Sequence, residues 1–467
     1  MGKRLPLIIA TTLIACLCVF PAHSAVKAGS SCKKIGSISF TSTKKFTCVR
    51  SGKKLLWNKG VSLVPVAPKV QPATTATPTP TPTPTATPVE APRTPTSALS
   101  QSTEYLDVSQ CKLINANNEL TNQSFQQSPY RVKNTQPIRA LIFPIDFPDL
   151  VAKTSPDSDF SSLTESISSF YSQMSDGRSK FSWTIHPKYV RYGENVADAK
   201  LGGRTATGYG VFSENAFKLA KQTVDTTKFD LIVYAPPPAT TRSQIAIGPA
   251  FVASNPTQIN ATMLDGQAYE GPTPYWATAH EIGHLMGLAD LYNYDAANEG
   301  AANPTKSIDD LQFRYMGVFD LMNWAGGGGV ELTAWNRWLI DLIADDQIRC
   351  LPTSFTTTLL TPVEVEGGIK GAVIPISRTQ AIVMESRRAL RYDGRLTPAS
   401  EGVLVYKVNT AIRSGFGPMQ VIPRTGSKDP LHRDAPLKSG ESISLEGYKI
   451  EVLEAGKFGD VVKVSKV

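Results

Sequence analysis

Short apolar runs alternate with amphipathic segments through the central part of the 467-residue chain. Apolar runs bounded by turn residues are typical of buried strands, and we predict strands over residues 138–147, 181–192 and 228–236. Residues 160–174 carry apolar side chains at helical spacing. Ser213 is suited to cap a second helix that begins there. This succession of strands and helices predicts an α/β arrangement.

The pattern changes after residue 350. Apolar residues then fall in short, β-branched segments that are separated by glycine, proline and aspartate. These segments cover residues 372–377, 381–386, 402–408, 448–455 and 460–467. Short strands with turn signals between them predict a C-terminal β-sandwich or barrel-like domain.

The chain begins with the features of a secretory signal. Lys3 and Arg4 precede an apolar run over residues 5–20, and small residues follow, so we predict cleavage after Ser24. The run is shorter than the about 20 apolar residues of a membrane span, and no later segment is long enough. An alternative is a lipoprotein signal in which Cys16 is lipidated. Both interpretations predict an exported protein, secreted in the first case and attached to the cell surface in the second.

Proline and cysteine mark out the rest of the N-terminal region. Many of the 34 prolines alternate with threonine over residues 62–102, a composition that favours an extended linker without a core. Residues 25–61 resemble a small β-rich module closed by a cysteine pair. The predicted organisation is therefore a signal peptide (1–24), a basic Cys-pair module (25–61), a linker (62–102), a central α/β domain (103–350) and a β-rich C-terminal domain (351–467).

The net charge of +8 is concentrated in the N-terminal module. Residues 25–60 contain eight lysines, one arginine and no acidic residue, whereas the chain after Gly60 sums to −3. Such a module would attract an anionic partner such as a cell-wall polymer or an acidic glycan. The alternative is that the charge only keeps the module solvated. An exported chain without a recognition motif is not expected to bind nucleic acid.

Four cysteines remain after the predicted signal. In an oxidising compartment they predict two disulfides, for which three pairings exist. Proximity in the sequence favours Cys32–Cys48, and the remaining pair, Cys111–Cys350, would join the start of the central domain to its end. The alternative is a free Cys111 whose thiolate occupies the open position of a metal ion.

The segment WATAHEIGHLMGLADLYNYD contains the residues that point to a metal site. His280 and His284 are four apart and therefore lie on one face of a helix, where both imidazoles can bind one zinc ion. Glu281 lies about 100° around the helix, where its carboxylate can take a proton from zinc-bound water. Gly287 allows the chain to turn out of the helix, so that Asp290 can supply the third ligand.

The competing interpretation is a pair of structural histidines on a buried helix. An HExxH match alone arises by chance in about one chain in a hundred of this length. A glycine and a ligand-type residue at fixed later positions lower that frequency by roughly two orders of magnitude. We therefore favour the metal site, and we expect His186 and His432 to take no part in it.

The extended motif HEIGHLMGLADLY (280–292) resembles the HExxHxxGxxD signature of the immune inhibitor A family of secreted metallopeptidases, a metzincin-like group. Residues 139–150 resemble the opening strand of that family, residues 317–343 its Met-containing turn, and residues 381–409 the start of its β domain. Together with the N-terminal cysteine pair, the resemblance implies an α/β (α+β) metzincin-like catalytic domain with a C-terminal β-sandwich domain and a small N-terminal disulfide module.

The same resemblance implies roles for individual residues. The zinc ligands would be His280, His284 and Asp290. Glu281 would be the general base, and Met322 would form a hydrophobic floor beneath the metal, with Asp320 in the same turn. Asn323 stands where the family often has serine, which is a departure from the pattern.

Aromatic and acidic residues near the motif leave alternatives open. Tyr292 and Tyr315 are candidates for stabilising the oxyanion, although packing is the simpler role for each. A later loop carboxylate is an alternative third ligand, and the same loop is a candidate calcium site because calcium prefers clustered oxygen ligands. These carboxylates are Asp295, Glu299, Asp309 and Asp310.

The sequence therefore predicts a secreted zinc-dependent endopeptidase that acts on protein or peptide substrates. Residues 243–254 are the candidate edge strand that receives an extended substrate. Two other classes of function remain: a non-catalytic surface adhesin on a peptidase fold, and a zinc amidase acting on cell-wall peptide. The intact ligand and base residues argue against the first of these.

Overall fold

The computed structural model describes residues 27–32, 38–40, 44–52, 54–59, 61–62, 104–199, 201, 206–241, 243–249, 252–254, 257–264, 274–352 and 356–467. The predicted signal peptide, the lipoprotein alternative at Cys16 and residues 63–102 of the predicted linker lie outside these residues. The chain divides into two compact units, Met1–Thr81 and Pro82–Val467.

The described part of the N-terminal unit is a small antiparallel sheet closed by a disulfide. Its strands are β1 (Ile38–Phe40), β2 (Lys44–Ser51), β3 (Lys54–Trp57) and β4 (Val61–Ser62). Strand β2 lies in the middle and pairs with the other three. The Cys32–Cys48 disulfide ties the segment before β1 to β2, which confirms the predicted pairing.

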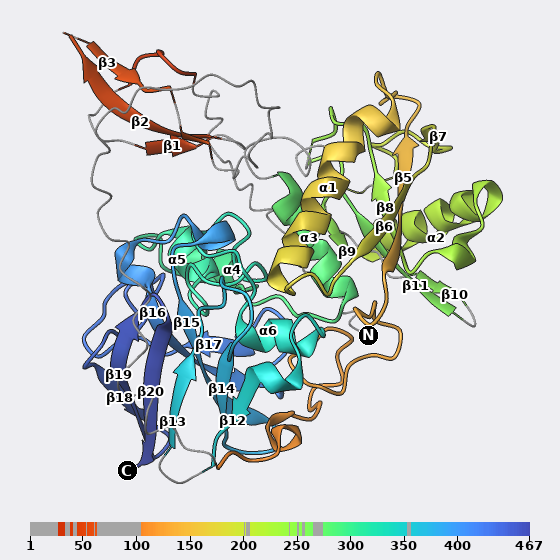
Figure 1. The fold of residues 1–467 in the computed structure, drawn as a ribbon. Helices are drawn as coiled ribbons and strands as arrows, with labels where there is room; N and C mark the ends of the chain where they lie inside the picture. Colours follow the sequence, from red (N-terminus) through yellow and green to blue (C-terminus); the bar gives the residue numbers. More distant parts are fainter. Residues whose placement is uncertain are drawn as a thin grey trace, which may run out of the picture. The chain divides into compact units, whose positions relative to one another are not determined.

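A seven-stranded sheet forms the first layer of the larger unit (Figure 1). Its strands are β5 (Ile138–Asp146), β6 (Phe181–Ile185), β7 (Val190–Arg191), β8 (Leu231–Ala235), β9 (Gly248–Pro249), β10 (Val252–Ser254) and β11 (Thr257–Met263). The main path runs β10-β11-β8-β5-β6, and its inner pairs are parallel. Strands β9 and β10 both run antiparallel to β11, so one edge of the sheet is antiparallel.

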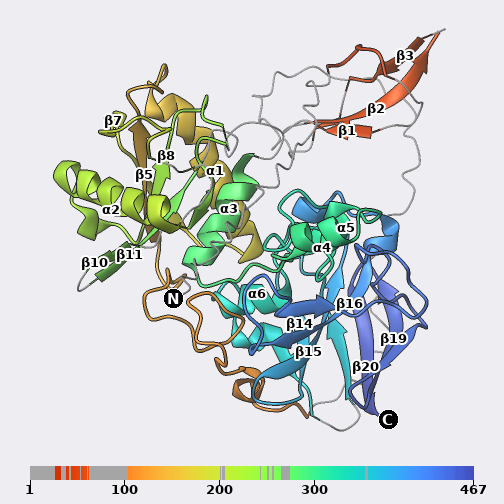
Figure 2. The same ribbon diagram turned by 180° about the vertical axis from the view of Figure 1, so that it is seen from behind.

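Helices cover both faces of this sheet, as Figures 1 and 2 show from opposite sides. Helices α1 (Pro156–Met174) and α3 (Pro274–Leu285) pack on one face, and α2 (Ala206–Thr223) packs on the other. Successive side chains of a strand point to opposite faces. On β5, Ala140 and Ile142 accordingly contact the core under α1 and α3, whereas Leu141 and Phe143 contact the core under α2. The mixed α/β class predicted from the sequence is therefore confirmed.

Several predicted boundaries were wrong. Helix α2 begins at Ala206, so Ser213 lies inside the helix instead of capping it. The two glycines at 208 and 210 are poor helix formers and hid the earlier start, whereas burial of Phe212 against the sheet favours it. The predicted strand over 181–192 is divided into β6 and β7. Strand β11, the polar segment TQINATM, was not predicted at all.

Two further sheets follow, and together they form a sandwich. The five-stranded sheet contains β12 (Ile348–Cys350), β14 (Gly371–Pro375), β15 (Gln380–Arg387), β16 (Gly402–Asn409) and β17 (Met419–Val421). The four-stranded sheet contains β13 (Thr356–Leu360), β18 (Ser442–Leu445), β19 (Tyr448–Gly456) and β20 (Gly459–Lys466). Apolar side chains of the two sheets share one core. The five segments predicted as strands after residue 350 are strands.

The five-stranded sheet is buried on both of its faces. On β15, Ile382 and Met384 point into the sandwich core, whereas Ala381 and Val383 point into the core that contains α1 and α3. Continuous burial explains the apolar run AIVM, since a strand with one solvated face would alternate with polar residues. The sheet is therefore a shared layer between the sandwich and the helix that bears the HExxH motif.

Short helices complete the larger unit. The α-helices are α4 (Ala296–Ala302), α5 (Ile308–Gln312) and α6 (Ala334–Leu339). The 3-10 helices cover Val108–Cys111, Thr226–Lys228, Asp345–Gln347, Arg391–Asp393 and Pro398–Ser400. Among the described residues, no helix has the length and apolar character needed to cross a lipid bilayer.

A second disulfide joins Cys111 to Cys350, which confirms the predicted pair. Both cysteines are buried, and 239 residues separate them in the sequence. The bond connects the 3-10 helix Val108–Cys111 to the end of β12, which is a strand of the five-stranded sheet. Because Cys111 is oxidised in the structure, its thiolate is not a ligand for a metal.

We expect replacement of both Cys111 and Cys350 by alanine to lower the free energy of unfolding by about 2–5 kcal/mol, because the bond constrains a long loop in the unfolded chain. Urea denaturation of the intact chain under oxidising conditions measures this change. The matched control is alanine at both Cys32 and Cys48, which belong to the other unit. A loss below about 1 kcal/mol in the larger unit would contradict the prediction.

Candidate metal centre

Helix α3 presents the two motif histidines, and the chain then turns sharply away. The helix ends at Leu285, and Gly287 adopts a φ of 111°. A residue with a Cβ is strained at this φ, so the turn favours glycine. The glycine predicted from the sequence as the exit from the helix is confirmed in that role, and Asp290 follows on the returning segment.

The three predicted ligands meet in one buried cluster. Nε2 of His280 lies 2.9 Å from Oδ1 of Asp290, and Nε2 of His284 lies 3.3 Å from the same oxygen. All three side chains are buried, and their candidate ligand atoms lie within 4.8 Å of one another. The fold therefore brings together two imidazoles and one carboxylate, the group that the motif predicted.

The other nitrogen of each imidazole faces a backbone carbonyl. Nδ1 of His280 lies 3.0 Å from the carbonyl oxygen of Leu321, and Nδ1 of His284 lies 2.8 Å from that of Leu288. A carbonyl only accepts hydrogen bonds, so each Nδ1 must carry the proton. When a ring is neutral, its Nε2 lone pair is directed at Asp290, so a proton or a metal cation between these atoms would stabilise the cluster.

The pKa values of His280 and Asp290 are shifted because these side chains lie so close together. Burial lowers the pKa of His280, but the hydrogen bond and the negative charge of Asp290 outweigh burial and raise this pKa to about 9. Burial by itself would raise the pKa of Asp290, but the charges and hydrogen bonds of His284 and His280 hold it well below its usual value. Without a metal, the cluster therefore binds a proton. The donor set equally fits a divalent metal, and its three ligands leave a position open.

Glu281 lies beside this cluster, and its side chain is buried. Its side chain is on the same helix as both histidines and is only 6% exposed. The oxygen Oε2 has no hydrogen-bond partner within the described structure. A buried carboxylate oxygen without a partner has lone pairs available for a water or a substrate group.

A turn from Asp320 to Met322 supports the motif helix from below. The Leu321 carbonyl orients His280, and the Met322 carbonyl accepts a hydrogen bond from the backbone of Leu291. Met322 is fully buried, and a Cβ at Gly283 would lie 2.8 Å from its sulfur. The methionine therefore packs directly against the helix between the two histidines, as the predicted hydrophobic floor requires.

Asp320 holds this turn in place. It adopts a φ of 72°, and its buried carboxylate accepts hydrogen bonds from the backbone N–H groups of Met322 and Thr333, each at 2.8 Å. The side-chain amide of Asn336 donates a third bond at 2.9 Å. Burial raises the pKa of Asp320, and these bonds oppose the rise by stabilising the charged form. The turn is thus tied to the beginning of α6.

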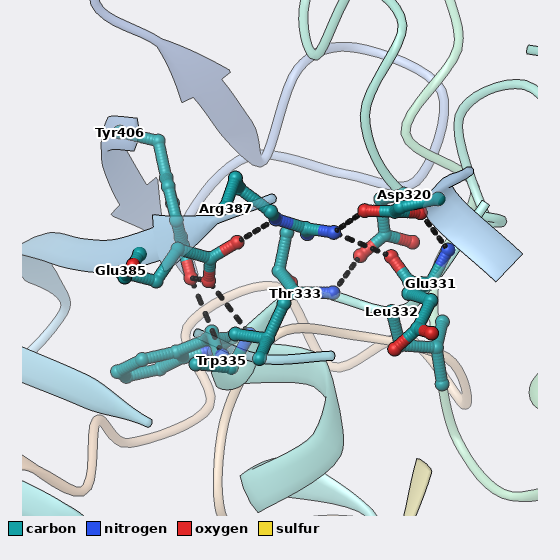
Figure 3. A network of polar contacts seen from close by, with 12 residues as sticks. Asp320, Glu331, Leu332, Thr333, Trp335, Glu385, Arg387 and Tyr406 are labelled. Carbon is teal, nitrogen blue, oxygen red and sulfur yellow. Dashed lines mark hydrogen bonds and ion pairs between the residues drawn. The ribbon is translucent and has the colours of Figure 1, made fainter. Parts of the chain in front are cut away.

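A buried ion network in turn holds the segment that leads into α6 (Figure 3). Arg387 of β15 donates to Oε1 of Glu385 and to Oδ2 of Asp393, both at 2.6 Å, and to the carbonyl of Glu331. The second oxygen of Glu385 accepts from the backbone N–H of Ala334 at 2.7 Å. Strand β15 of the shared sheet therefore fixes the segment from which Thr333 and Asn336 reach Asp320.

Burial raises the pKa of two carboxyls in this buried region. Burial raises the pKa of Asp393 to about 6, with Arg387 opposing the rise and Glu331 adding to it. Burial and the neighbouring charge of Asp393 raise the pKa of Glu364 well above its usual value. More carboxyls than guanidinium groups are buried here, which favours the protonated form of Glu364.

Of the other candidate residues, Tyr292 lies near the ligand cluster and the rest have other surroundings. Tyr292 is partly buried with its ring centre 6.2 Å from that of His280, so it lies near the site. Tyr315 instead accepts a hydrogen bond from Arg314 and packs on Gly417. Among the described residues, the side chains that could together bind a metal ion are those of His280, His284 and Asp290. The later loop carboxylates do not belong to this group; they are Asp295, Glu299, Asp309 and Asp310.

The other two histidines in the described part of the chain have ordinary partners. His186 contacts the carbonyl of Lys188 through Nδ1, and Nε2 of His432 contacts the carbonyl of Arg314. Neither belongs to the cluster, as predicted. Glu299 pairs with Arg314, which gives it a structural role in the loop.

Two residues that contact the cluster were not predicted. Tyr294 donates to Asp290, and Ser414 accepts from the backbone of Asp290. Tyr294 lies only four residues after Asp290, and a polar aromatic at that spacing is the one local signal that pointed to it. Ser414 is 124 residues away in the sequence and has no motif around it.

No known family model matches the chain, and no curated protein matches it either.

We expect Glu364→Gln to stabilise the protein increasingly as the pH rises. The pKa of Glu364 is higher in the folded state than in the unfolded state, so its contribution is complete at low pH and is lost as the pH rises through the folded value. Glutamine keeps the neutral form at every pH. Each pKa unit of difference corresponds to about 1.4 kcal/mol, so the gain from about pH 5 to pH 8 should exceed about 1 kcal/mol.

Urea denaturation of wild type and variant over this pH range measures the gain. Glu366→Gln is the matched control, because Glu366 lies two residues away on the surface and pairs only with Arg391. A stability difference that is independent of pH would show that the Glu364 carboxyl is already charged in the folded protein.

Proposed function

We propose that this chain is a secreted zinc-dependent endopeptidase that resembles the immune inhibitor A family and has a metzincin-like catalytic domain. The observation that carries the proposal is the convergence of both Nε2 atoms and one Asp290 oxygen beside an unpaired Glu281 oxygen. Two imidazoles, one carboxylate and an open position are typical of catalytic zinc sites. A zinc ion held there would polarise the scissile carbonyl and increase the acidity of the attacking water.

Glu281 is the general base in this proposal. Its free carboxylate oxygen accepts a proton from the attacking water and later delivers that proton to the departing amine. The helix keeps the carboxylate one position along from His280, which places it beside the ligands and outside their set. Met322 packs beneath the helix and limits its movement, which keeps base and ligands in one relative orientation.

The antiparallel edge of the central sheet is the proposed site for the substrate backbone. Strands β9 and β10 both pair with β11, and β9 packs against α3. An extended peptide can add to such an edge through backbone hydrogen bonds. Residues 243–254 were predicted to form this edge strand. Within them, Gly248–Pro249 and Val252–Ser254 are strands, residues 243–247 are not, and residues 250 and 251 lie outside the described structure.

Secretion is the proposed location. The two disulfides are compatible with an oxidising, extracellular environment. The signal-like residues 1–24 and the basic residues 25–60 extend the proposal to export and to attraction by an anionic surface polymer.

We expect Glu281→Gln to reduce casein cleavage by about 10²–10⁴-fold, because glutamine cannot accept the proton. The variant should keep its metal, since Glu281 is not one of the ligands. Initial cleavage rates and metal content by mass spectrometry are measured on the same samples. Wild-type cleavage by the variant would exclude Glu281 as the base.

We expect Asp290→Ala to lose the metal, because the alanine removes one of three ligands and leaves two histidines. Wild type should contain about one zinc per chain and lose cleavage when a chelator removes it. Zinc retained by the variant would identify a different third ligand. A peptidoglycan-release assay run in parallel separates peptidase from amidase activity, and a metal-free, inactive wild type would favour the adhesin.

A further inference from the structure

We propose that Tyr294 and Ser414 are positioning residues that fix Asp290 as a metal ligand, so that the β16–β17 loop (residues 410–418) helps to set the metal affinity. This inference rests on the metal centre of the proposed function and does not depend on the reaction performed there. Neither residue belongs to the HExxHxxGxxD motif, and neither would touch the metal.

The two oxygens of Asp290 have different partners. Oδ1 faces Nε2 of His280 and Nε2 of His284. Oδ2 accepts a hydrogen bond from the hydroxyl of Tyr294 at 2.5 Å. A carboxylate only accepts, so the tyrosine must be the donor, and its bond stabilises the charged form that a metal requires. With Oδ2 engaged, Oδ1 is the oxygen left for the metal.

The backbone of Asp290 is held by the same loop. Its N–H donates to Oγ of Ser414 at 2.9 Å, and its carbonyl accepts from the N–H of Gly415 at 2.9 Å. The N–H of Tyr294 donates to the carbonyl of Gly415 at 3.0 Å. The ligand segment and the loop are therefore joined by reciprocal hydrogen bonds, which restrict both the position and the rotation of the carboxylate.

Gly415 provides the space for the tyrosine ring. It adopts a φ of 78°, and a Cβ there would lie 2.2 Å from Cγ of Tyr294. The ring of Phe416 packs against the Tyr294 ring in an edge-to-face arrangement, with ring centres 5.9 Å apart. The ring is thus seated on the loop, and its hydroxyl is directed at Asp290.

The loop is itself anchored at a second place. The N–H of Ser414 donates to Oε2 of Glu119 at 2.9 Å, and the amide of Asn117 donates to the carbonyl of Ile412 at 3.0 Å. The third ligand is therefore positioned through a segment that precedes the central sheet and through a loop of the shared sheet. Contacts of this kind outside the ligand shell typically change metal affinity by about 10–100-fold when they are removed.

The experiment measures zinc affinity in the metal-depleted full-length chain by competition with a chromophoric chelator. Tyr294→Phe keeps the ring and removes the hydroxyl, and we expect the zinc Kd to rise by about 10–100-fold. Ser414→Ala should also raise the Kd. Because both act on Asp290, the effect of the double variant should be smaller than the product of the two single effects.

Tyr189→Phe is the matched control. The hydroxyl of Tyr189 donates to Oδ2 of Asp159 at 2.7 Å, so this is also a hydrogen bond from a tyrosine to an aspartate. Asp159 lies in the first turn of α1 and is not one of the candidate metal ligands. This control should leave the zinc Kd unchanged. Circular dichroism of each metal-free variant checks that the fold is retained, and Ser414→Ala provides an independent test if Tyr294→Phe does not fold.

An unchanged Kd in a folded Tyr294→Phe variant would overturn the inference, as would a wild type that binds no zinc. A raised Kd supports it even when the wild type cleaves no protein substrate. In that case the positioning role stands and the proposed peptidase activity fails, so the two results remain distinguishable.

Discussion

Arg387 makes the buried ion pairs on which the geometry of the candidate site depends. Burying a guanidinium is favourable only when carboxylates neutralise it and accept its hydrogen bonds, and removing one partner of such a pair typically costs about 3–5 kcal/mol. Glu385 and Asp393 supply those partners with no exposed surface. Glu385 also accepts from the first turn of α6, next to the N–H group that holds Asp320. The ion pairs of β15 therefore reach His280 through the turn that carries Leu321.

This connection explains why burial of both faces of the five-stranded sheet, which contains β15, matters for the geometry of the candidate site. A sheet with one solvated face could shift without disturbing a neighbouring domain. Here the same strands contribute to the sandwich core and to the core behind α3, so movement of one requires repacking of the other. The loop after β16 adds a second connection, because Ser414 and Gly415 bond directly to the backbone of Asp290. The ligand set is thus local in sequence but is held by much of the larger unit.

The locality of the ligands also determines what could be predicted. His280 and His284 are readable because helical geometry alone places residues four apart on one face, and Gly287 because its conformation excludes a side chain. The strands and the disulfides followed from apolar runs and from cysteine arithmetic. Ser414 contacts Asp290, Glu385 contacts Ala334 and Arg387 contacts the carbonyl of Glu331 over long sequence separations, and no local pattern encodes these contacts. Strand β11 was missed for a related reason, since its polar residues acquire strand structure through pairing with β8 and β10.

The ion network and the candidate metal centre follow one electrostatic rule. Each buries more acceptors and negative charge than the surrounding protein neutralises. In the network, burial and the charge of Asp393 raise the pKa of Glu364, which favours a proton on Glu364. In the centre, the carbonyls of Leu321 and Leu288 hold both imidazoles with their Nε2 lone pairs inward. Protonating either nitrogen satisfies only part of this group. A divalent ion could contact all three side chains at once, because their candidate ligand atoms lie within 4.8 Å of one another.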